Sequence, residues 1–334
     1  MSQYRTLYID PKGPGDSRPT ATQIVEDEQM QKKLIGKTAV ITGVSSGIGI
    51  ETARALAVTG IKLFLTARDL DKAKEALASF WNPDQMELVQ LELSSMDSVR
   101  TAAKSILSKT DDISIYIANA GVMAVPELRK TADGFEEQFA TNHLSHFLLF
   151  ELLKPALLLG STPEFQSRVV VVSATAHRIH GIGASDDHNY EKSGSSDYSP
   201  WKAYACSKTA NIYMANEIER RCSSRGIHAT SVGPGLVYSG IGRYVPEEVM
   251  LSVIESRMNH IQSTGQAAAS TLVAAVGKEW EGRGGVYITN CVPAERGEDD
   301  GVSISETYVS HTYSPDNEGR LWSDSLELVK KWHD

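Results

Sequence analysis

Short apolar runs alternate with amphipathic segments along most of the chain. The runs predict strands at 38–42, 61–67, 87–93, 113–118, 168–172, 227–232 and 285–289. Apolar residues at helical spacing predict helices at 48–58, 70–80, 96–107, 133–159, 204–223, 246–260 and 265–276. Apolar strands that alternate with helices are typical of a mostly parallel sheet buried on both faces. The sequence therefore predicts an α/β protein with a doubly wound, seven-stranded sheet and helices on both faces.

The chain carries further segments on both sides of this alternating region. Residues 1–35 are polar and rich in Pro and Gly, which predicts an extended arm, and the acidic, amphipathic piece 26–34 predicts a short helix at its end. Residues 36–292 show no shift in composition and are interpreted as a single domain. Residues 293–334 are expected to add an irregular acidic loop and a last helix at 321–332.

Composition is that of an ordinary globular protein. Of the 334 residues, 41% are apolar and 22% are charged. Thirty-three Lys and Arg against 42 Asp and Glu give a formal net charge of −9, which argues against a nucleic-acid surface. The three cysteines, Cys206, Cys222 and Cys291, are odd in number and widely spaced, so neither a disulfide framework nor a zinc cluster is expected. A reducing, cytoplasmic location fits best.

No segment has the pattern of a membrane anchor. The N-terminus has no basic stretch followed by an apolar run, so neither a secretory signal nor an anchoring helix is expected. The longest apolar stretch, 147–159, is interrupted by Glu151, Lys154 and Pro155. It is too short and too charged to span a bilayer.

The first candidate site is the glycine-rich segment Thr42–Gly49 between the first strand and the first helix. Gly43 permits a tight turn, Gly47 lets the backbone approach a pyrophosphate, and Gly49 allows close helix packing. The helix N-terminus offers free N–H groups and a positive dipole to phosphates. A simple strand-to-helix turn would also explain the glycines, so this segment needs support from elsewhere in the chain.

The second candidate is the pair Tyr204 and Lys208. Residues four apart lie on one face of a helix, so the ammonium of Lys208 is expected near the hydroxyl of Tyr204, where it would lower the pKa of the phenol and reach the ribose of a cofactor. Tyr204 would then exchange a proton with a carbonyl or an alcohol. Such a pair is also common on solvated helices, but the glycine-rich segment upstream supports a catalytic role for it.

Together these motifs resemble the short-chain dehydrogenase/reductase family. Its patterns Thr-Gly-x-x-x-Gly-Ile-Gly and Tyr-x-x-x-Lys match as just described, and three further segments match its motifs: Ala118–Gly121, Thr141–Leu144 and Pro234–Val237. The segments 133–147 and 168–173 are most similar to the retinol dehydrogenase and WW-domain oxidoreductase branch and to fungal secondary-metabolite reductases. The resemblance implies a Rossmann-like fold, a nicotinamide cofactor and hydride transfer between it and a carbonyl or alcohol. The family often dimerises through its fourth and fifth helices, so a homodimer is also expected.

The resemblance also implies a role for individual residues. In the family, the Asn that matches Asn142 holds a water in the proton relay, beside Tyr204 and Lys208. The residues expected to contact the cofactor are Gly43, Ser45, Ser46, Gly47, Ile48, Gly49, Arg68, Glu92, Leu93, Asn119, Ala120, Gly121, Tyr204, Lys208, Pro234, Gly235, Val237 and Ser239.

One position departs from the family pattern. The family has two consecutive serines after the fifth strand, and the second binds the substrate oxygen. Here Ser173 matches the first, and Ala174 stands at the second. Three readings are open: Ser173 or Thr175 takes the role, the site works with Tyr204, Lys208 and Asn142 alone, or the chemistry is no longer carbonyl reduction. Ser173 is kept as the fourth catalytic candidate.

Charge at the end of the second strand favours NADP(H) as the cofactor. A carboxylate at this point binds the ribose 2′-hydroxyl of NAD, whereas a 2′-phosphate requires a cation. The strand is followed by Arg68 before the first acid, Asp69, and Lys72 could assist. Glu92 stands where the family commonly has Asp.

The segments 122–128, 180–201 and 236–262 are expected to form the substrate walls. Their large side chains predict a pocket for a lipophilic carbonyl or alcohol: Met123, Val125, Tyr198, Trp201, Tyr238, Tyr244, Val245 and Met250. No metal is expected, because His177 and His180 lack a third ligand nearby. Two alternatives remain, a cofactor-retaining isomerase or cyclase and a nucleotide-binding interaction protein.

Overall fold

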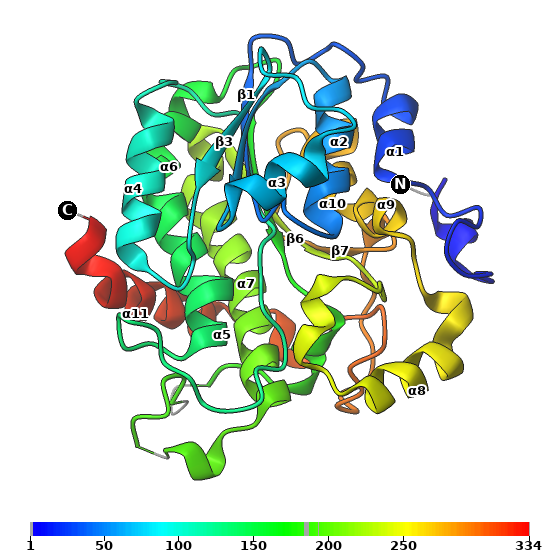
Figure 1. Cartoon of the computed structure of the whole chain (residues 1–334), viewed down its shortest axis with the longest axis vertical. Coiled ribbons are helices and arrows are strands. Elements are labelled where there is room, and N and C mark those ends of the chain that lie inside the picture. The colour runs from blue at the N-terminus through cyan, green and yellow to red at the C-terminus, as the bar shows by residue number, and fades with distance from the viewer. Residues whose placement is uncertain (1–2, 184–186, 193, 334) are drawn as a thin grey trace.

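A sheet of eight strands forms the centre of the protein (Figure 1). The computed structural model describes residues 3–183, 187–192 and 194–333. The strand order is β3-β2-β1-β4-β5-β6-β7-β8, with β8 antiparallel to β7 and all other neighbours parallel. The strands are β1 (Thr38–Thr42), β2 (Lys62–Ala67), β3 (Met86–Gln90), β4 (Ile115–Ala118), β5 (Ser167–Val172), β6 (Ile227–Gly233), β7 (Tyr287–Thr289) and β8 (Val292–Pro293).

This topology confirms the predicted doubly wound α/β sheet, with two corrections to the strands. An eighth strand of two residues follows β7 after a turn in which Asn290 and Cys291 both have positive φ. Two residues are too few to carry a period-two pattern, so this strand could not be predicted from the sequence. The predicted strand 87–93 ends at Gln90, because Leu91 and Leu93 leave the sheet to line a cavity.

Helices cover both faces of the sheet (Figure 1). Adjacent strand residues point to opposite faces: Val40 packs in the core under α4, α6, α7 and α11, and Ile41 packs in the core under α1, α2, α3 and α10. The helices are α1 (Ala21–Asp27), α2 (Ile48–Val58), α3 (Leu70–Leu77), α4 (Met96–Leu107), α5 (Glu137–Phe139), α6 (Ser145–Gly160), α7 (Pro200–Cys222), α8 (Glu247–Arg257), α9 (Thr264–Ala267), α10 (Ala269–Val276) and α11 (Pro315–His333).

Short 3-10 turns connect several of these elements. They are η1 (Arg5–Tyr8), η3 (Thr175–Ile179), η4 (Ser195–Asp197), η5 (Ser223–Arg225), η6 (Gly240–Tyr244), η7 (Met258–His260), η8 (Lys278–Trp280) and η9 (Ser310–Thr312). Two predicted helices are thereby divided. The helix expected at 246–260 is α8 followed by η7, and the one expected at 265–276 is α9 followed by α10. None of the helices in the described ranges is long and apolar enough to cross a membrane.

The long helix predicted at 133–159 is interrupted near its start. It begins at Glu137 as the single turn α5, continues as a π-turn, η2 (Ala140–Leu144), and becomes α6 at Ser145. In the π-turn the N–H of Ser145 donates to the carbonyl of Ala140, five residues back instead of four. The apolar pattern continues through this turn, which is why the sequence predicts a single helix over 133–159.

The N-terminal arm carries a helix, but earlier than predicted. Instead of 26–34, the helix is α1 (Ala21–Asp27), whose N-terminus is capped by the hydroxyl of Thr20. Ile24 and Val25 are fully buried beside α2 and α10. The helix therefore forms where its apolar residues meet the domain, and the acidic stretch that follows only ends it.

The C-terminal helix α11 covers an outer face of the domain, crossing α4, α6 and α7 (Figure 1). Trp322 is its main anchor. The indole is 6% exposed and meets Phe147 and Phe150 edge to face, with ring centroids 4.8 and 6.2 Å away. The guanidinium of Arg221 lies 5.0 Å from its ring. Aromatic packing of this kind contributes more than its buried area alone.

We expect Trp322→Ala to lower the free energy of unfolding by about 3–5 kcal/mol, because it leaves a cavity between α6, α7 and α11. Urea denaturation followed by circular dichroism measures the loss. Leu328→Ala on the same helix is the control, since Leu328 is 42% exposed and should change stability by no more than about 0.5 kcal/mol. Equal losses in the two variants would show that Trp322 does not anchor the helix.

Candidate active site

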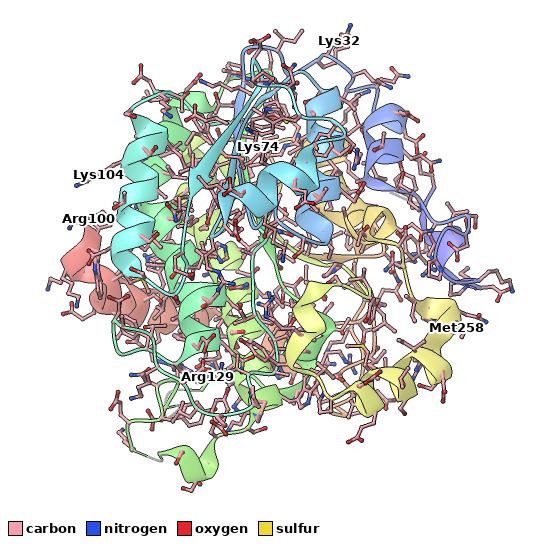
Figure 2. The ribbon with its side chains drawn as sticks, viewed as in Figure 1. Lys32, Lys74, Arg100, Lys104, Arg129 and Met258 are labelled. Carbon is pink, nitrogen blue, oxygen red and sulfur yellow. The ribbon has the colours of Figure 1, made fainter. Side chains whose placement is uncertain are left out.

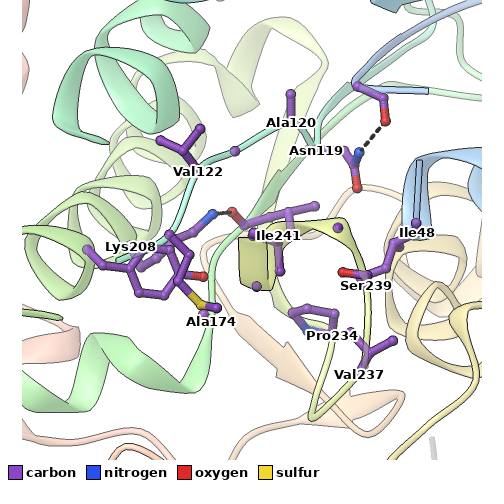
Figure 3. A pocket seen from close by; sticks show the side chains of 18 of the residues that line it. Ile48, Asn119, Ala120, Val122, Ala174, Lys208, Pro234, Val237, Ser239 and Ile241 are labelled. Carbon is purple, nitrogen blue, oxygen red and sulfur yellow. Dashed lines mark hydrogen bonds between the residues drawn. The ribbon is translucent and has the colours of Figure 1, made fainter. Parts of the chain in front are cut away.

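A cavity of about 640 Å³ lies along the carboxyl edge of the sheet, between the segments that follow β1, β2, β4, β5 and β6. This is where ligands bind in open α/β sheets. In Figure 3, Ala174 and Lys208 lie on one side of it, and Ile48, Ser239 and Val237 on the other. All the predicted cofactor-binding residues line the cavity except Gly49. Of the predicted catalytic residues, Tyr204, Lys208 and Ser173 line it and Asn142 does not.

The glycine-rich segment is packed tightly against the end of β4. Gly43 has a φ of 78°, and a Cβ on it would lie 2.8 Å from the Cβ of Ala120. A Cβ on Gly49 would lie 2.2 Å from the carbonyl oxygen of Gly43. Any larger residue at either position would push α2 or β4 away. Gly49 therefore acts through packing, which explains why it does not line the cavity.

The start of α2 is suited to a phosphate group. Ser45, Ser46, Gly47 and Ile48 line the cavity, and within the described residues none of their backbone N–H groups donates to a protein acceptor. α2 also has no side-chain cap. Uncapped N–H groups at a helix N-terminus, with the helix dipole behind them, form an anion site. The residues present therefore fit the pyrophosphate of a dinucleotide.

Arg68 stands at the far end of the cavity, after β2. Its side chain is 77% exposed, and its Nε lies 3.6 Å from the carboxylate of Glu92. Asp69 is turned away from this role, because its carboxylate accepts the N–H of Lys72 and caps α3. Lys72 is absent from the described lining of the cavity. Asp69, the acid that could bind a free ribose 2′-hydroxyl, therefore caps α3, whereas Arg68 lines the cavity.

Tyr204 and Lys208 lie side by side in the first turns of α7, which begins at Pro200 and is capped by Ser199. The ammonium of Lys208 is 5.7 Å from the ring centroid of Tyr204 and donates to the carbonyl of Val172 at 3.1 Å. Burial raises the pKa of Tyr204 above its usual value and lowers the pKa of Lys208 to about 8. The expected lowering of the phenol pKa by Lys208 is not seen, because burial raises the pKa of Tyr204 instead.

Asn142 lies in the π-turn, where its side chain makes three hydrogen bonds. The side-chain oxygen accepts the N–H of Val122 at 2.8 Å, and the side-chain nitrogen donates to the carbonyl of Val122 and to the hydroxyl of Ser207, both at 2.9 Å. The amide therefore fixes the loop after β4 to α7. Both protons of the side-chain nitrogen are used, so the side chain could bind a solvent molecule of a proton relay only by accepting at its oxygen, which has a second lone pair.

Ser173 is not placed to donate to a substrate. Its hydroxyl donates to the backbone carbonyl of Lys208 at 2.7 Å and is 1% exposed. A hydroxyl has one proton, and this one is already used. Ala174 lines the cavity in the position of the family's second serine, and Thr175 lines it one residue further on.

The substrate walls match the prediction in part. Of the eight expected side chains, Met123, Trp201, Val245 and Met250 line the cavity. The other four do not: Val125 is buried, Tyr198 donates to the carbonyl of Val125, Tyr238 is 67% exposed, and Tyr244 stacks with arginines. Residues 184–186 and 193 of the loop 180–201 lie outside the described residues. Further apolar lining comes from Ile179, Leu236, Ile241, Val249, Val253 and Ile304.

A segment near the C-terminus also reaches the cavity, and no motif in the sequence predicts it. Ser303 and Ile304 line the cavity from a stretch that reads as an acidic surface loop. Arg178 in η3 holds this stretch: its guanidinium donates to the carbonyls of Glu298 and Val302 and pairs with Asp300 at 2.7 Å. The side chain of Arg178 is only 1% exposed. A single arginine thus fixes the C-terminal wall to the segment that follows β5.

The remaining histidine and cysteine candidates have structural contacts. The ring of His177 packs against Tyr287, with its Nδ1 2.8 Å from the carbonyl of Ala174. No group of three His, Cys, Asp or Glu in the described ranges could hold a metal ion. Cys206, Cys222 and Cys291 are buried and form no disulfide bond within the described residues.

The fold, the glycine-rich turn and the Tyr204–Lys208 pair define a nucleotide-dependent enzyme of the doubly wound class. The profile of the family described as short chain dehydrogenase matches residues 37–186. Together with relatives that cover nearly the whole chain, this shows that the protein belongs to the short-chain dehydrogenase/reductase family, whose members are oxidoreductases that use a nicotinamide cofactor.

The relatives agree with the resemblance read from the motifs. The chain is 45% identical over 329 residues to the short-chain dehydrogenase/reductase prx1 of Penicillium roqueforti, covering 98% of this chain and 95% of that one. It is 33% identical to the WW domain-containing oxidoreductase of Homo sapiens, over 85% of this chain and 71% of that protein. A crystal structure of an uncharacterized protein from Mycobacterium paratuberculosis is similar at 30% identity, with a TM-score of 0.65, covering 89% of this chain and 94% of that one.

Replacing the buried Lys208 should stabilise the protein without nucleotide. With a folded pKa of about 8 against 10.5 for the free side chain, the ammonium destabilises the fold fully below pH 8, and the penalty disappears as the pH rises to 10.5. We expect Lys208→Met to raise the free energy of unfolding by about 1–3 kcal/mol at pH 7, with part of the gain offset by the lost bond to Val172.

Urea denaturation at pH 7 and at pH 10 measures this difference. The gain should shrink at the higher pH. Lys74→Met on α3 is the matched control, because Lys74 is exposed and Figure 2 shows it on the outer surface. A loss of stability in Lys208→Met at pH 7 would contradict the argument.

Proposed function

We propose that the protein is an NADP(H)-dependent oxidoreductase that reduces a lipophilic ketone or aldehyde. The observation that carries the proposal is one continuous cavity that joins the uncapped start of α2 and Arg68 to Tyr204 and Lys208. A cavity lined in this way can hold a dinucleotide and a small substrate end to end. Family membership supports the class of reaction, and the finer assignments below depend on the site.

The catalytic end supplies a proton and positions the substrate. When bound, the nicotinamide cofactor supplies hydride transfer to the carbonyl carbon. Burial raises the pKa of Tyr204, so the phenol is protonated at neutral pH and can donate to the carbonyl oxygen. Lys208 carries charge beside it and would stabilise the phenolate left behind. A tyrosine that holds its proton favours reduction over oxidation.

The preference for the phosphorylated cofactor follows from the groups around Arg68. A 2′-phosphate can pair with the exposed guanidinium, and the carboxylate of Asp69 is bound to α3. Glu92 is the opposing feature, because its carboxylate lies near Arg68 and would have to turn aside. Its contact with Arg68 is long and exposed, which makes it weak.

The lipophilic substrate follows from the outer wall of the cavity. Val249, Met250 and Val253 of α8 line the cavity, and so do Trp201 of α7 and Ile304 of the C-terminal segment. No hydroxyl stands at position 174, so the substrate oxygen would be held by Tyr204 with less help than in the family. Apolar contacts would then supply most of the binding free energy.

The same alanine supports a second candidate, a cofactor-retaining isomerase or cyclase. Such an enzyme would bind the nucleotide and use Tyr204 as an acid or base without net hydride transfer. A nucleotide-binding interaction protein is a third reading, and it would keep its function when Tyr204 is replaced.

The cellular setting is part of the proposal. Three buried cysteines without a disulfide bond among the described residues favour a reducing compartment such as the cytoplasm. The likeness to fungal reductases supports a role in secondary metabolism. The homodimer expected from the resemblance would use α6 and α7. Since α11 covers these helices, we do not propose a dimer across this face.

We expect NADP⁺ to stabilise the protein against heat more than NAD⁺ does. At about one hundred times its dissociation constant a ligand adds about 2.7 kcal/mol. Arg68→Ala should weaken NADP⁺ binding by about 10- to 100-fold and leave NAD⁺ binding nearly unchanged, because only the 2′-phosphate uses the guanidinium. Thermal-shift titration measures both affinities, with Lys74→Ala as the control for charge. Equal loss for both nucleotides would overturn the assignment of Arg68.

In an activity assay, NADPH absorbance should fall faster with a bulky lipophilic ketone than with a small polar one. Tyr204→Phe should reduce the rate at least about 100-fold, because it removes the proton donor but keeps the ring. Unchanged nucleotide affinity in Tyr204→Phe is the control for folding. Product isomerisation without NADPH consumption would favour the second candidate, and a preference for the small ketone would contradict the apolar pocket.

A further inference from the structure

His146 connects the two ends of the site, and the mechanism above does not use it. It lies in α6 and is fully buried. Its Nε2 is 2.8 Å from the hydroxyl oxygen of Thr42, at the end of β1. Its Nδ1 is 3.0 Å from the backbone carbonyl oxygen of Asn142, in the π-turn. One imidazole ring thus contacts both the strand that leads into the glycine-rich turn and the residue beside the catalytic pair.

The hydrogen bonds of Thr42 determine which nitrogen carries the proton. Its hydroxyl oxygen accepts the N–H groups of Asn119 at 2.9 Å and of Ala120 at 3.0 Å. Both acceptor positions are therefore filled, and the hydroxyl must donate its proton elsewhere. Nε2 of His146 at 2.8 Å is a better acceptor than the carbonyl of Ile117 at 3.5 Å. Nε2 is then unprotonated, and Nδ1 carries the hydrogen and donates it to Asn142.

The surroundings keep the ring neutral. Burial lowers the pKa of His146 to about 4, and the nearby charge of Lys208 acts in the same direction. At neutral pH the imidazole therefore has one donor and one acceptor, which matches its two partners. A protonated ring would lose the hydrogen bond from Thr42, because Nε2 could no longer accept.

Both partners stand next to functional groups. Thr42 holds the amides of Asn119 and Ala120, which line the cofactor end of the cavity. At the other end, a Cβ on Gly121 would lie 2.9 Å from the side-chain oxygen of Asn142 and 3.5 Å from the ammonium of Lys208, so these two groups meet across that glycine. His146 binds the backbone carbonyl of the same residue, Asn142, so its ring helps to fix Asn142 next to Lys208.

We propose that His146 is a positioning residue that couples cofactor binding to proton transfer. Its acceptor nitrogen fixes Thr42 and, through it, the loop after β4. Its donor nitrogen fixes the π-turn at Asn142, whose side-chain oxygen lies near the ammonium of Lys208. The inference rests on the proposed function only in its assumption that the cavity binds NADP(H) and that Asn142 and Lys208 serve the reaction.

Two substitutions can separate the two contacts. Asn at position 146 places an amide nitrogen where Nδ1 stands, so His146→Asn keeps the donor to Asn142 and loses the acceptor for Thr42. Gln places an amide oxygen where Nε2 stands, so His146→Gln keeps the acceptor for Thr42 and loses the donor. His146→Phe removes both contacts and retains an aromatic ring of similar bulk.

We expect a different kinetic loss from each variant. His146→Asn should raise the dissociation constant for NADP⁺ about tenfold and change kcat with a lipophilic ketone by less than about twofold. His146→Gln should lower kcat about tenfold with NADP⁺ affinity nearly unchanged, and His146→Phe should show both losses. The proposal would be overturned if His146→Asn and His146→Gln changed the dissociation constant for NADP⁺ and kcat in the same way, in proportion to the drop in melting temperature. His146 would then have a purely structural role.

Hydrogen exchange of the protein without nucleotide tests the same contacts without activity. His146→Asn should speed exchange in 117–122 and His146→Gln in 140–146, each relative to wild type. If both variants speed exchange equally in 117–122 and in 140–146, the proposal is overturned, whatever the turnover measurements show. Wild-type protein that binds no nucleotide overturns the proposed function, and the exchange data then still decide whether His146 holds both segments.

Discussion

The site depends on the close approach of the ends of β1 and β4. These strands are neighbours in the sheet although two strands separate them in the sequence, and the sheet order reverses between them. A Cβ on Gly43 would lie 2.8 Å from the Cβ of Ala120, so glycine lets the two segments approach. The hydroxyl of Thr42 also accepts the backbone N–H groups of Asn119 and Ala120, which follow β4. Because the two chain segments are fixed together here, α2 and the loop after β4 open onto one cleft.

The end of that cleft around Tyr204 and Lys208 lowers the stability of the fold. Lys208 is 2% exposed, and its one described hydrogen bond is to a backbone carbonyl, so an ammonium is buried with little compensation. Tyr204 beside it is also buried, and the neighbouring strand end contributes Ala174 where a polar residue could have helped. A ligand with ribose hydroxyls would supply the missing partners. Binding such a ligand would lower this cost in stability, so part of the stability lost in the protein would be recovered as affinity.

Much of the fold could be predicted, because local residues determine it. The alternation of apolar runs and amphipathic segments located seven strands, and the spacing of Gly43, Gly47 and Gly49 located the turn. The misses have physical causes: the π-turn continues the apolar pattern of its helix, β8 has two residues, and α1 forms where Ile24 and Val25 meet the domain. The direction of the pKa of Tyr204 depends on burial, and burial is set by packing that no local pattern records.

The substrate end could be predicted least, because it is assembled from distant segments. α8, the start of α7 and the stretch around Ser303 come together only in the folded chain, and Arg178 fixes the last of these to the segment that follows β5. Arg178 lies four residues after Ala174, so the position that lacks the family's hydroxyl and the anchor of the C-terminal wall belong to one short segment. A substitution in this segment would therefore affect two parts of the proposed substrate end, the lining at Ala174 and the C-terminal stretch that Arg178 holds. The glycine-rich turn and the Tyr204–Lys208 pair lie on other segments, so they need not change with it.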